Sequence, residues 1–209
     1  LAAEHAKSQT PKGKYVLGSV GPTGEFLEPL GNISEKEMYN AFRDQAMALE
    51  SGGADGVVVE TMTAMEEAAV AIKAARENTK LVIAATMTFD KGPRGYFTMM
   101  GITPEKAAEG LANAGADIVG TNCGNGIENM IEIAQKMRDA TDKPILVHSN
   151  AGIPDMKEGE IIYPESPTYM AEGFLKLKDV GVNVIGGCCG TGPEHIKALT
   201  DIIKEGKVK

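Results

Sequence analysis

Six short runs of apolar residues, rich in valine and isoleucine, recur along the chain between longer amphipathic stretches. The runs cover residues 15–20, 56–61, 81–87, 117–123, 145–150 and 182–189. They are nearly continuous rather than alternating, which is typical of strands buried on both faces of a parallel sheet. The pattern therefore predicts an α/β protein in which six strands alternate with helices.

The amphipathic stretches carry helix start and stop signals. Four candidate starts pair a Ser or Thr cap with a downstream Glu or Pro: Ser34 with Glu37, Thr63 with Glu66, Thr103 with Pro104, and Ser166 with Pro167. Three helix-to-strand connections also resemble one another: Gly53-Ala54-Asp55, Gly115-Ala116-Asp117 and Gly181-Val182-Asn183. Each connection ends a helix at glycine and leads into a strand, so the chain is built from repeated βα units.

A succession of right-handed βα units gives either an open, doubly wound sheet or a (β/α)8 barrel. The turn after the first run, Gly21-Pro22-Thr23-Gly24, lacks the G-x-G-x-x-G pattern of a dinucleotide-binding fold. Polar and reactive residues gather at the carboxyl ends of several runs, where barrel enzymes concentrate their chemistry. We therefore expect a (β/α)8 TIM-type barrel that lacks its first one to two βα units at the N-terminus, preceded by a helical segment from Leu1 to about Ser8. The 209 residues would form a single, N-terminally truncated domain.

Composition and charge narrow the range of partners. The net charge is −8, which argues against nucleic acid or an anionic membrane surface as the main partner. No apolar run approaches the ~18 residues of a membrane span, and no signal-peptide pattern is present. The three cysteines are odd in number and two are adjacent, so free or metal-bound thiols in the cytoplasm are expected rather than a secreted disulfide framework.

The cysteines are the strongest chemical signal in the sequence. Cys123 ends one predicted strand, and Cys188 and Cys189 end another strand two βα units later. Three thiolates suit Zn²⁺ and leave a fourth coordination position open, as in catalytic zinc sites. Two other interpretations stay open at this point: cysteines buried as small apolar residues, and a redox pair formed by Cys188 and Cys189.

The ligand set predicts a particular chemistry. Three thiolates and Zn²⁺ carry a net charge of about −1, which makes the metal a poor Lewis acid for water. The same site is well suited to hold a fourth sulfur as a thiolate, because zinc coordination deprotonates a thiol whose free pKa is ~8.5. The excess negative charge keeps that sulfur nucleophilic. We therefore expect a thiol substrate that becomes S-alkylated.

Several motifs together resemble the homocysteine S-methyltransferase family. They are Gly18-Ser19-Val20-Gly21-Pro22-Thr23-Gly24, Val59-Glu60-Thr61, Gly120-Thr121-Asn122-Cys123, Asn150-Ala151-Gly152 and Gly186-Gly187-Cys188-Cys189-Gly190-Thr191. The resemblance covers almost the whole chain, and within the family it is greatest to the homocysteine-binding module of cobalamin-dependent methionine synthases. It implies a zinc methyltransferase that converts homocysteine to methionine, with zinc held by Cys123, Cys188 and Cys189.

The resemblance also implies roles for other residues and partners. Glu60 would bind the amino group of homocysteine, and Asn122 and Asn150 would orient substrate or ligands. The methyl donor would be methylcobalamin on another domain or subunit, or a small methylated compound. A homo-oligomer or another domain would cover the sheet edge left open by the absent strands. The alternatives are a metal- or thiol-binding module that is inactive on its own, and a thiol-redox protein that uses Cys188 and Cys189. His148 and His195 are expected to be structural.

Overall fold

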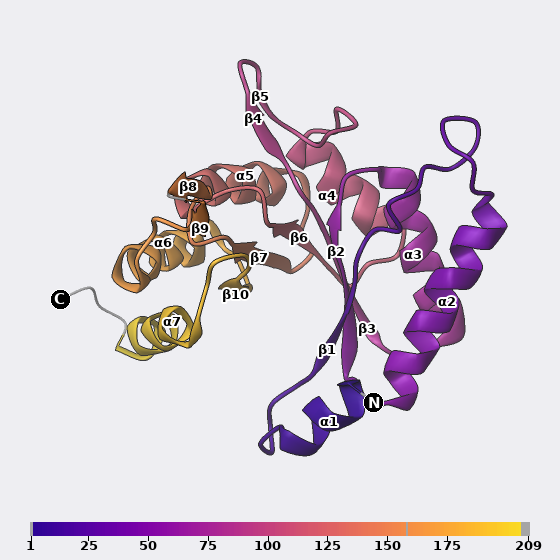
Figure 1. Ribbon diagram of the computed structural model, residues 1–209, viewed down its shortest axis with the longest axis horizontal. Coiled ribbons are helices and arrows are strands. Elements are labelled where there is room, and N and C mark those ends of the chain that lie inside the picture. The colour runs from indigo at the N-terminus through magenta and orange to yellow at the C-terminus, as the bar shows by residue number, and fades with distance from the viewer. Residues whose placement is uncertain (1, 158, 206–209) are drawn as a thin grey trace.

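The computed structural model describes residues 2–157 and 159–205 of the chain. Its centre is one parallel sheet of six strands in the order β1-β2-β3-β6-β7-β10. The strands are β1 (Leu17–Val20), β2 (Gly56–Met62), β3 (Val82–Met87), β6 (Ile118–Asn122), β7 (Ile145–Ser149) and β10 (Val184–Gly187). Figure 1 shows that the sheet curls, with the helices around its outer side. All six predicted strands are confirmed, and the sheet forms a partial barrel.

Most of the helices connect successive strands of the sheet, while the first precedes the first strand and the last follows the last strand. They are α1 (Ala2–Gln9), α2 (Glu35–Ser51), α3 (Met65–Asn78), α4 (Pro104–Asn113), α5 (Ile127–Ala140), α6 (Pro167–Val180) and α7 (Pro193–Glu205). The expected N-terminal helix is present as α1, although Leu1 lies outside the described residues. Among the described residues, the parallel sheet has six strands, whereas a closed (β/α)8 barrel has eight.

Three of the four predicted helix starts are confirmed. Ser34 forms the complete capping box with Glu37, and the hydroxyls of Thr103 and Ser166 accept backbone N–H bonds in the first turns of α4 and α6. The capping box predicted at Thr63 is wrong. Helix α3 starts one residue later, after Ala64, and has no side-chain cap, because the alanine side chain carries no hydrogen-bond acceptor.

The main core lies between the outer face of the sheet and the helices. Buried side chains on one stripe of α2 (Met38, Phe42, Ala46) and one stripe of α5 (Ile127, Met130, Met137) pack there. The concave face carries a smaller cluster of Val58, Ala84 and Leu146. That face is apolar but partly open, since Val82, two residues before Ala84 on the same face, is 47% exposed.

The three similar helix-to-strand connections have a common structural purpose. The side chains of Asp55, Asp117 and Asn183 each accept a backbone N–H bond from the neighbouring strand segment, at Val16, Ile83 and Ile145 respectively. Their own N–H groups donate back to the carbonyls of the same three residues. Each connection is therefore clamped at two points to the preceding strand, which fixes the pairing register of the sheet at its amino end.

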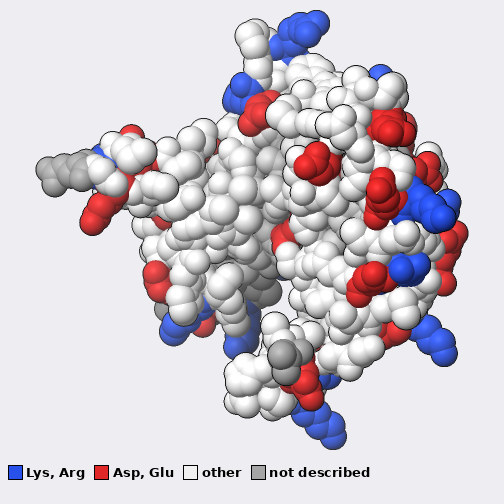
Figure 2. All heavy atoms as spheres, turned by 45° about the vertical axis from the view of Figure 1, so that its right-hand side comes forward, with Lys and Arg blue, Asp and Glu red and all other residues white. Residues whose placement is uncertain are grey.

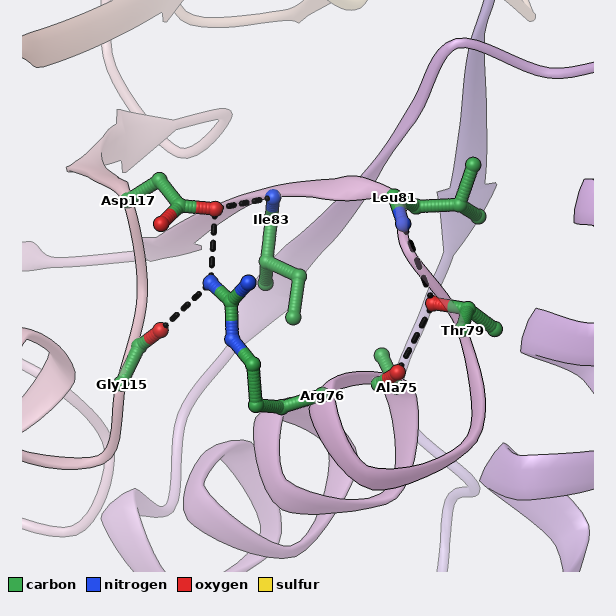
Figure 3. A network of polar contacts seen from close by, with 7 residues as sticks. All are labelled: Ala75, Arg76, Thr79, Leu81, Ile83, Gly115 and Asp117. Atoms are coloured by element: carbon green, nitrogen blue, oxygen red, sulfur yellow. Dashed lines mark hydrogen bonds and ion pairs between the residues drawn. The ribbon is translucent and has the colours of Figure 1, made fainter.

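The clamp at Asp117 is reinforced by a cation (Figure 3). Arg76, on α3, donates to the carboxylate of Asp117 at 2.7 Å and to the carbonyl of Gly115 at 3.0 Å. Nearby, the hydroxyl of Thr79 donates to the carbonyl of Ala75 and accepts from the N–H of Leu81. The end of α3 and the starts of β3 and β6 are thus tied together by side-chain hydrogen bonds.

Two antiparallel hairpins extend from the sheet, in addition to the six predicted strands. They are β4 (Asp90–Gly92) with β5 (Gly95–Phe97), and β8 (Asp155–Lys157) with β9 (Glu160–Ile162). Figure 2 shows a hollow near the centre of one face of the molecule, walled mainly by uncharged residues, with acidic and basic residues mixed over the outer surface. In the described part of the chain, no helix has the length and apolar character needed to cross a membrane.

Candidate metal centre

The three cysteines meet at the carboxyl end of the sheet. The Sγ atoms of Cys123 and Cys189 are 3.7 Å apart, those of Cys188 and Cys189 are 4.0 Å apart, and all three lie within 4.8 Å of one another. Tetrahedral zinc with Zn–S bonds near 2.3 Å requires sulfur atoms about 3.8 Å apart. The predicted trio therefore converges with the spacing that one tetrahedral ion needs, and this geometry fits a zinc ligand set.

The strand register explains why these distant residues meet. Asn122, at the end of β6, pairs with His148 on β7, and Gly187, at the end of β10, pairs with Ser149 on β7. Cys123 and Cys188 are the next residues after these two strand ends. They therefore leave the sheet at nearly the same level, on either side of β7.

Cys123 sits in a strained turn that points it at the partner cysteines. Its φ angle is 59°, a left-handed conformation that is uncommon for a residue with a Cβ atom. The turn is held by a bond from the Cys123 N–H to the carbonyl of His148 and another from the Asn125 N–H to the carbonyl of Cys123. Strain of this kind persists only where surrounding contacts fix it, and it is concentrated at functional sites.

Cys188 and Cys189 are presented by a glycine turn after β10. The N–H of Cys188 donates to the carbonyl of Ser149 at 2.7 Å, and the N–H of Cys189 donates to Oδ1 of Asn150 at 3.0 Å. Gly190 has a φ of +78°, which reverses the chain directly after the pair. The two adjacent side chains can therefore face one point.

The thiols share charge unequally in the absence of a metal. A hydrogen bond from the Cys188 thiol is the main cause that lowers the pKa of Cys123 to about 5, against the effect of burial and with help from the N–H of Gly124. The same hydrogen bond, together with burial, raises the pKa of Cys188. At neutral pH the cluster thus carries a thiolate at Cys123, ready for a soft cation, while the exposed Cys189 remains accessible.

Asn122 is fully buried, and its side-chain amide forms hydrogen bonds with other residues of the protein. Its Oδ1 accepts from the N–H of Thr61 and the hydroxyl of Thr86, both at 2.7 Å. Its Nδ2 donates to the Thr61 hydroxyl at 2.8 Å and also faces a carboxylate oxygen of Glu60 at 3.5 Å and Sγ of Cys188 at 3.8 Å. Asn122 therefore links the Glu60–Thr61 segment to the cysteine cluster.

The carboxylate of Glu60 faces the same rim. One of its oxygens accepts a bond of 2.5 Å from the hydroxyl of Ser19 on β1, and the other lies beside Asn122. The structure thus brings the predicted substrate residues Glu60, Asn122 and Asn150 close to the cysteines, although their predicted contacts with substrate stay a prediction. Glu60 keeps an accessible carboxylate, while Asn150 is buried and holds the N–H of Cys189.

The histidines have no place among the candidate ligands found in the described residues. His195 is buried, accepts from the N–H of Gly192 at Nδ1, and places Nε2 3.1 Å from the carbonyl of Glu165. The structural role predicted for His195 is confirmed by these contacts. For His148, burial is the main cause that lowers its pKa, and the charge of Glu60 opposes the shift. His148 is therefore neutral near pH 7.

The sequence alone did not single out Tyr163, which lies beside the cysteines. It follows the β8–β9 hairpin, 26 positions before Cys189 in the chain. Burial is the main cause that raises its pKa, followed by the charge of Cys189 and a hydrogen bond to it. Tyr163 reaches the site because of the conformation of residues 151–165, the segment between β7 and α6 that contains the β8–β9 hairpin. No motif in the sequence predicts this conformation.

Comparison with known proteins agrees with the fold and the cysteine motifs. Methionine synthases of Mycobacterium leprae and Mycobacterium tuberculosis are each 30% identical to the chain, over 91% and 89% of its length. The chain spans only 16% of either relative. The metallated form of the homocysteine methyltransferase MmuM from Escherichia coli superposes with a TM-score of 0.72 at 23% identity, over 96% of this chain and 66% of that one.

The apo form of the same enzyme superposes with a TM-score of 0.70 at 24% identity. These structural likenesses support the α/β half-barrel as a large part of a known fold. The sequence model for homocysteine S-methyltransferase matches residues 1–203, which is nearly the whole chain. The chain therefore belongs to the homocysteine S-methyltransferase family.

Proposed function

We propose that this chain binds zinc through Cys123, Cys188 and Cys189, holds homocysteine as a thiolate on that zinc, and presents its sulfur for methylation to methionine. The observation that carries the proposal is the convergence of three Sγ atoms at the spacing of one tetrahedral ion. Membership of the family supplies the substrate and the reaction. The exposed side of Cys189 provides the approach for a fourth sulfur.

Zinc, when bound, supplies a soft cation that keeps the substrate sulfur deprotonated near neutral pH. The substrate sulfur then attacks the methyl carbon of the donor, and the donor leaves with the electron pair of the broken bond. The proton of the substrate thiol passes to solvent on binding. No general acid or base of the protein is required, so the residues of the chain act by positioning the substrate and by excluding water from its sulfur.

Each surrounding residue has a positioning role in this proposal. Glu60 binds the ammonium group of homocysteine through a carboxylate that Ser19 and Asn122 already hold in place. Asn122 keeps that carboxylate and Cys188 at a fixed separation, so the amino end and the sulfur of one substrate can be bound together. Asn150 orients Cys189 by accepting its N–H.

The methyl donor is proposed to arrive on another domain or subunit, with methylcobalamin as its carrier. The support is that the methionine synthase relatives are about six times longer than the part this chain matches. A small methylated compound is the alternative donor. We further propose that residues 1–209 act as one homocysteine module, and that strands outside this chain, or a second subunit, complete an eight-stranded barrel at the β1 and β10 edges.

The test of the zinc site is metal analysis with and without homocysteine. We expect one zinc per chain and, by X-ray absorption at the zinc edge, one additional sulfur ligand when homocysteine is added. The Cys188→Ala, Cys189→Ala double variant should lose the zinc, whereas Met156→Ala, on the exposed β8–β9 hairpin, should retain it. Full zinc stoichiometry in the double variant would overturn the proposal.

A thiol-redox function is the second candidate, favoured by the 3.7 Å separation of Cys123 and Cys189 and the 4.0 Å separation of the adjacent pair. Intact-mass measurement separates the two. A reversible loss of two hydrogens in the zinc-loaded protein would support redox chemistry, and an unchanged mass would exclude it. A module that binds metal but is inactive alone would be revealed by methyl transfer in a longer chain and none in this one.

A further inference from the structure

The concave face of the sheet carries a layer of polar side chains just below the cysteines. Val58, Ala84 and Leu146 form the apolar cluster on this face, and side chains alternate between the two faces along a strand. The residues two positions further along β2, β3 and β7 therefore point to the same side, together with the residues of β1 and β6 that bond to them. This polar layer consists of Ser19, Glu60, Thr86, Asn122 and His148.

Most hydrogen-bonding groups of the polar layer are already used within the protein. Ser19 donates to Glu60, and Thr86 donates to Asn122. His148 is the exception, since its half-buried ring forms no hydrogen bond with any described residue. No buried side-chain nitrogen or oxygen among the described residues lacks a hydrogen-bond partner. Both ring nitrogens of His148 are therefore open to solvent on the concave side.

Gly186 on β10 leaves room for the His148 ring. The two residues are paired in register, and a Cβ atom at Gly186 would lie 2.8 Å from Cδ2 and 3.0 Å from Nε2 of the ring. On its other side, His148 is paired with Asn122 of β6. Glu60 approaches Asn122 from β2, at 3.5 Å from Nδ2. The imidazole and the Glu60 carboxylate thus lie on opposite sides of Asn122, below the cysteines.

The charges of the site favour different places for the two polar ends of an amino acid. The carboxylate of Glu60 attracts an ammonium group and repels a second carboxylate, as do the thiolates of the cysteine cluster. A substrate carboxylate therefore needs a donor that is separate from Glu60 and not already used. Imidazole presents at least one N–H donor whether it is neutral or protonated. His148 is the member of the polar layer that meets this requirement.

We propose that His148 is a substrate-binding residue, whose ring N–H binds the carboxylate group of homocysteine while Glu60 binds the ammonium group. The inference rests on the proposed function and deepens it. The sulfur and the two polar ends of the substrate then each have a separate partner. The site thereby selects an α-amino acid thiol over a thiol that lacks either polar group.

The competing explanation is the structural role predicted from the sequence, in which the His148 ring only fills the space above Gly186. The His148→Phe variant separates the two, because it keeps a ring and removes both nitrogens. The probes are three thiols titrated into the zinc-loaded protein by calorimetry: homocysteine, 3-mercaptopropylamine, which lacks the carboxylate, and 4-mercaptobutanoate, which lacks the amino group. His5→Phe, at an exposed position on α1, is the matched control.

In His148→Phe we expect homocysteine and 4-mercaptobutanoate to bind about 10-fold more weakly, because their carboxylate loses its donor. The affinity for 3-mercaptopropylamine should not change, since this thiol has no carboxylate to lose. His148→Asn, which restores a side-chain N–H, should recover part of the affinity for the two carboxylate-bearing thiols. The control should match the unmodified protein with all three thiols.

Equal losses for all three thiols in His148→Phe, or no loss for any of them, would overturn the role of His148 while leaving the proposed function intact. Equal affinity of the unmodified protein for homocysteine and 3-mercaptopropylamine would overturn that role as well. Failure of the unmodified, zinc-loaded protein to bind any of the three thiols would overturn the proposed function itself. If His148→Phe does not fold, His148→Ala is measured instead, and the ratio of its affinities for homocysteine and 3-mercaptopropylamine decides the question.

Discussion

Oδ1 of Asn122 accepts a hydrogen bond of 2.7 Å from the backbone N–H of Thr61. The bond connects the residue after Glu60 with the residue before Cys123, and both Glu60 and Cys123 belong to the predicted site. Thr61 follows Glu60 and has a φ of 63°, a strained conformation for a β-branched residue. Asn122 precedes Cys123, which has a φ of 59°. The Asn122 side chain therefore stabilises the left-handed conformation of Thr61 on β2. In the chain, Asn122 also directly precedes the second left-handed residue, Cys123, after β6.

Loss of this amide should destabilise the protein. In Asn122→Ala, the N–H of Thr61 and the buried hydroxyl of Thr86 lose their acceptor, and an unsatisfied buried group costs about 1–3 kcal/mol. We expect the free energy of unfolding in urea to fall by about 2–4 kcal/mol. Asn40→Ala, on α2, should change it by less than about 0.5 kcal/mol. Equal stability of the two variants would show that Asn122 does not hold Thr61.

The low pKa of Cys123 predicts an unusual reactivity for the metal-free protein. Because its pKa is about 5, the thiolate fraction of Cys123 should rise through pH 5 rather than near the ordinary value of ~8.5. The rate of iodoacetamide alkylation, followed by peptide mass spectrometry from pH 4 to 9, should reach half its maximum near pH 5 at Cys123. Cys188, whose pKa is raised, should react much later. A common midpoint above pH 8 for both would contradict this arrangement, and added zinc should protect both residues.

The clamp at Asp117 predicts a pH-dependent contribution to stability. Burial opposes ionisation of Asp117, but the Ile83 N–H and the Arg76 guanidinium outweigh it and lower its pKa. A depressed pKa stabilises the fold above the unfolded value of ~3.9, and this stabilisation is lost as the pH falls through the folded value.

Asp117→Asn should therefore unfold at lower urea concentration than the parent at pH 7, by about 1 kcal/mol after allowance for its partial exposure. The difference should shrink toward zero below about pH 4. Asp142→Asn, at an exposed position after α5, is the control and should follow the parent at every pH. A difference that stays constant down to pH 2 would assign the effect to something other than ionisation.

His195 should control the mobility of the 151–165 segment. Its ring accepts from Gly192 and contacts the carbonyl of Glu165, so His195→Ala removes one of the anchors at the end of that segment. We expect limited proteolysis within residues 152–164 to become about 10-fold faster, because local opening exposes the cleavage site. His5→Ala, at an exposed position on α1, should leave the rate unchanged. Unaltered cleavage in His195→Ala would show that the hydrogen bonds of Glu165 with Ala151 and Ile127 alone anchor the segment.

The parts of the fold that depend on local pattern could be predicted from the sequence. Continuous apolar runs located all six strands, and the cysteines at strand ends located the cluster. The capping box at Thr63 failed because α3 starts one residue later than the motif predicts, after Ala64, whose side chain cannot accept a hydrogen bond. Tyr163 escaped notice for a different reason. Its proximity to Cys189 depends on anchors at Ala151 and Glu165 that pair residues distant in the sequence.

The clamps at Asp55, Asp117 and Asn183 lie at the amino ends of β2, β6 and β10, at the opposite end of the sheet from the cysteines. A strand advances about 3.3 Å per residue, so a one-residue shift in register at a clamp would also displace the carboxyl end of that strand by about 3.3 Å. This displacement nearly equals the 3.7 Å distance between the sulfurs of Cys123 and Cys189. The spacing of the three sulfurs thus depends on acidic and amide side chains that never approach them, and substitutions at these clamps should disturb that spacing as well as the sheet.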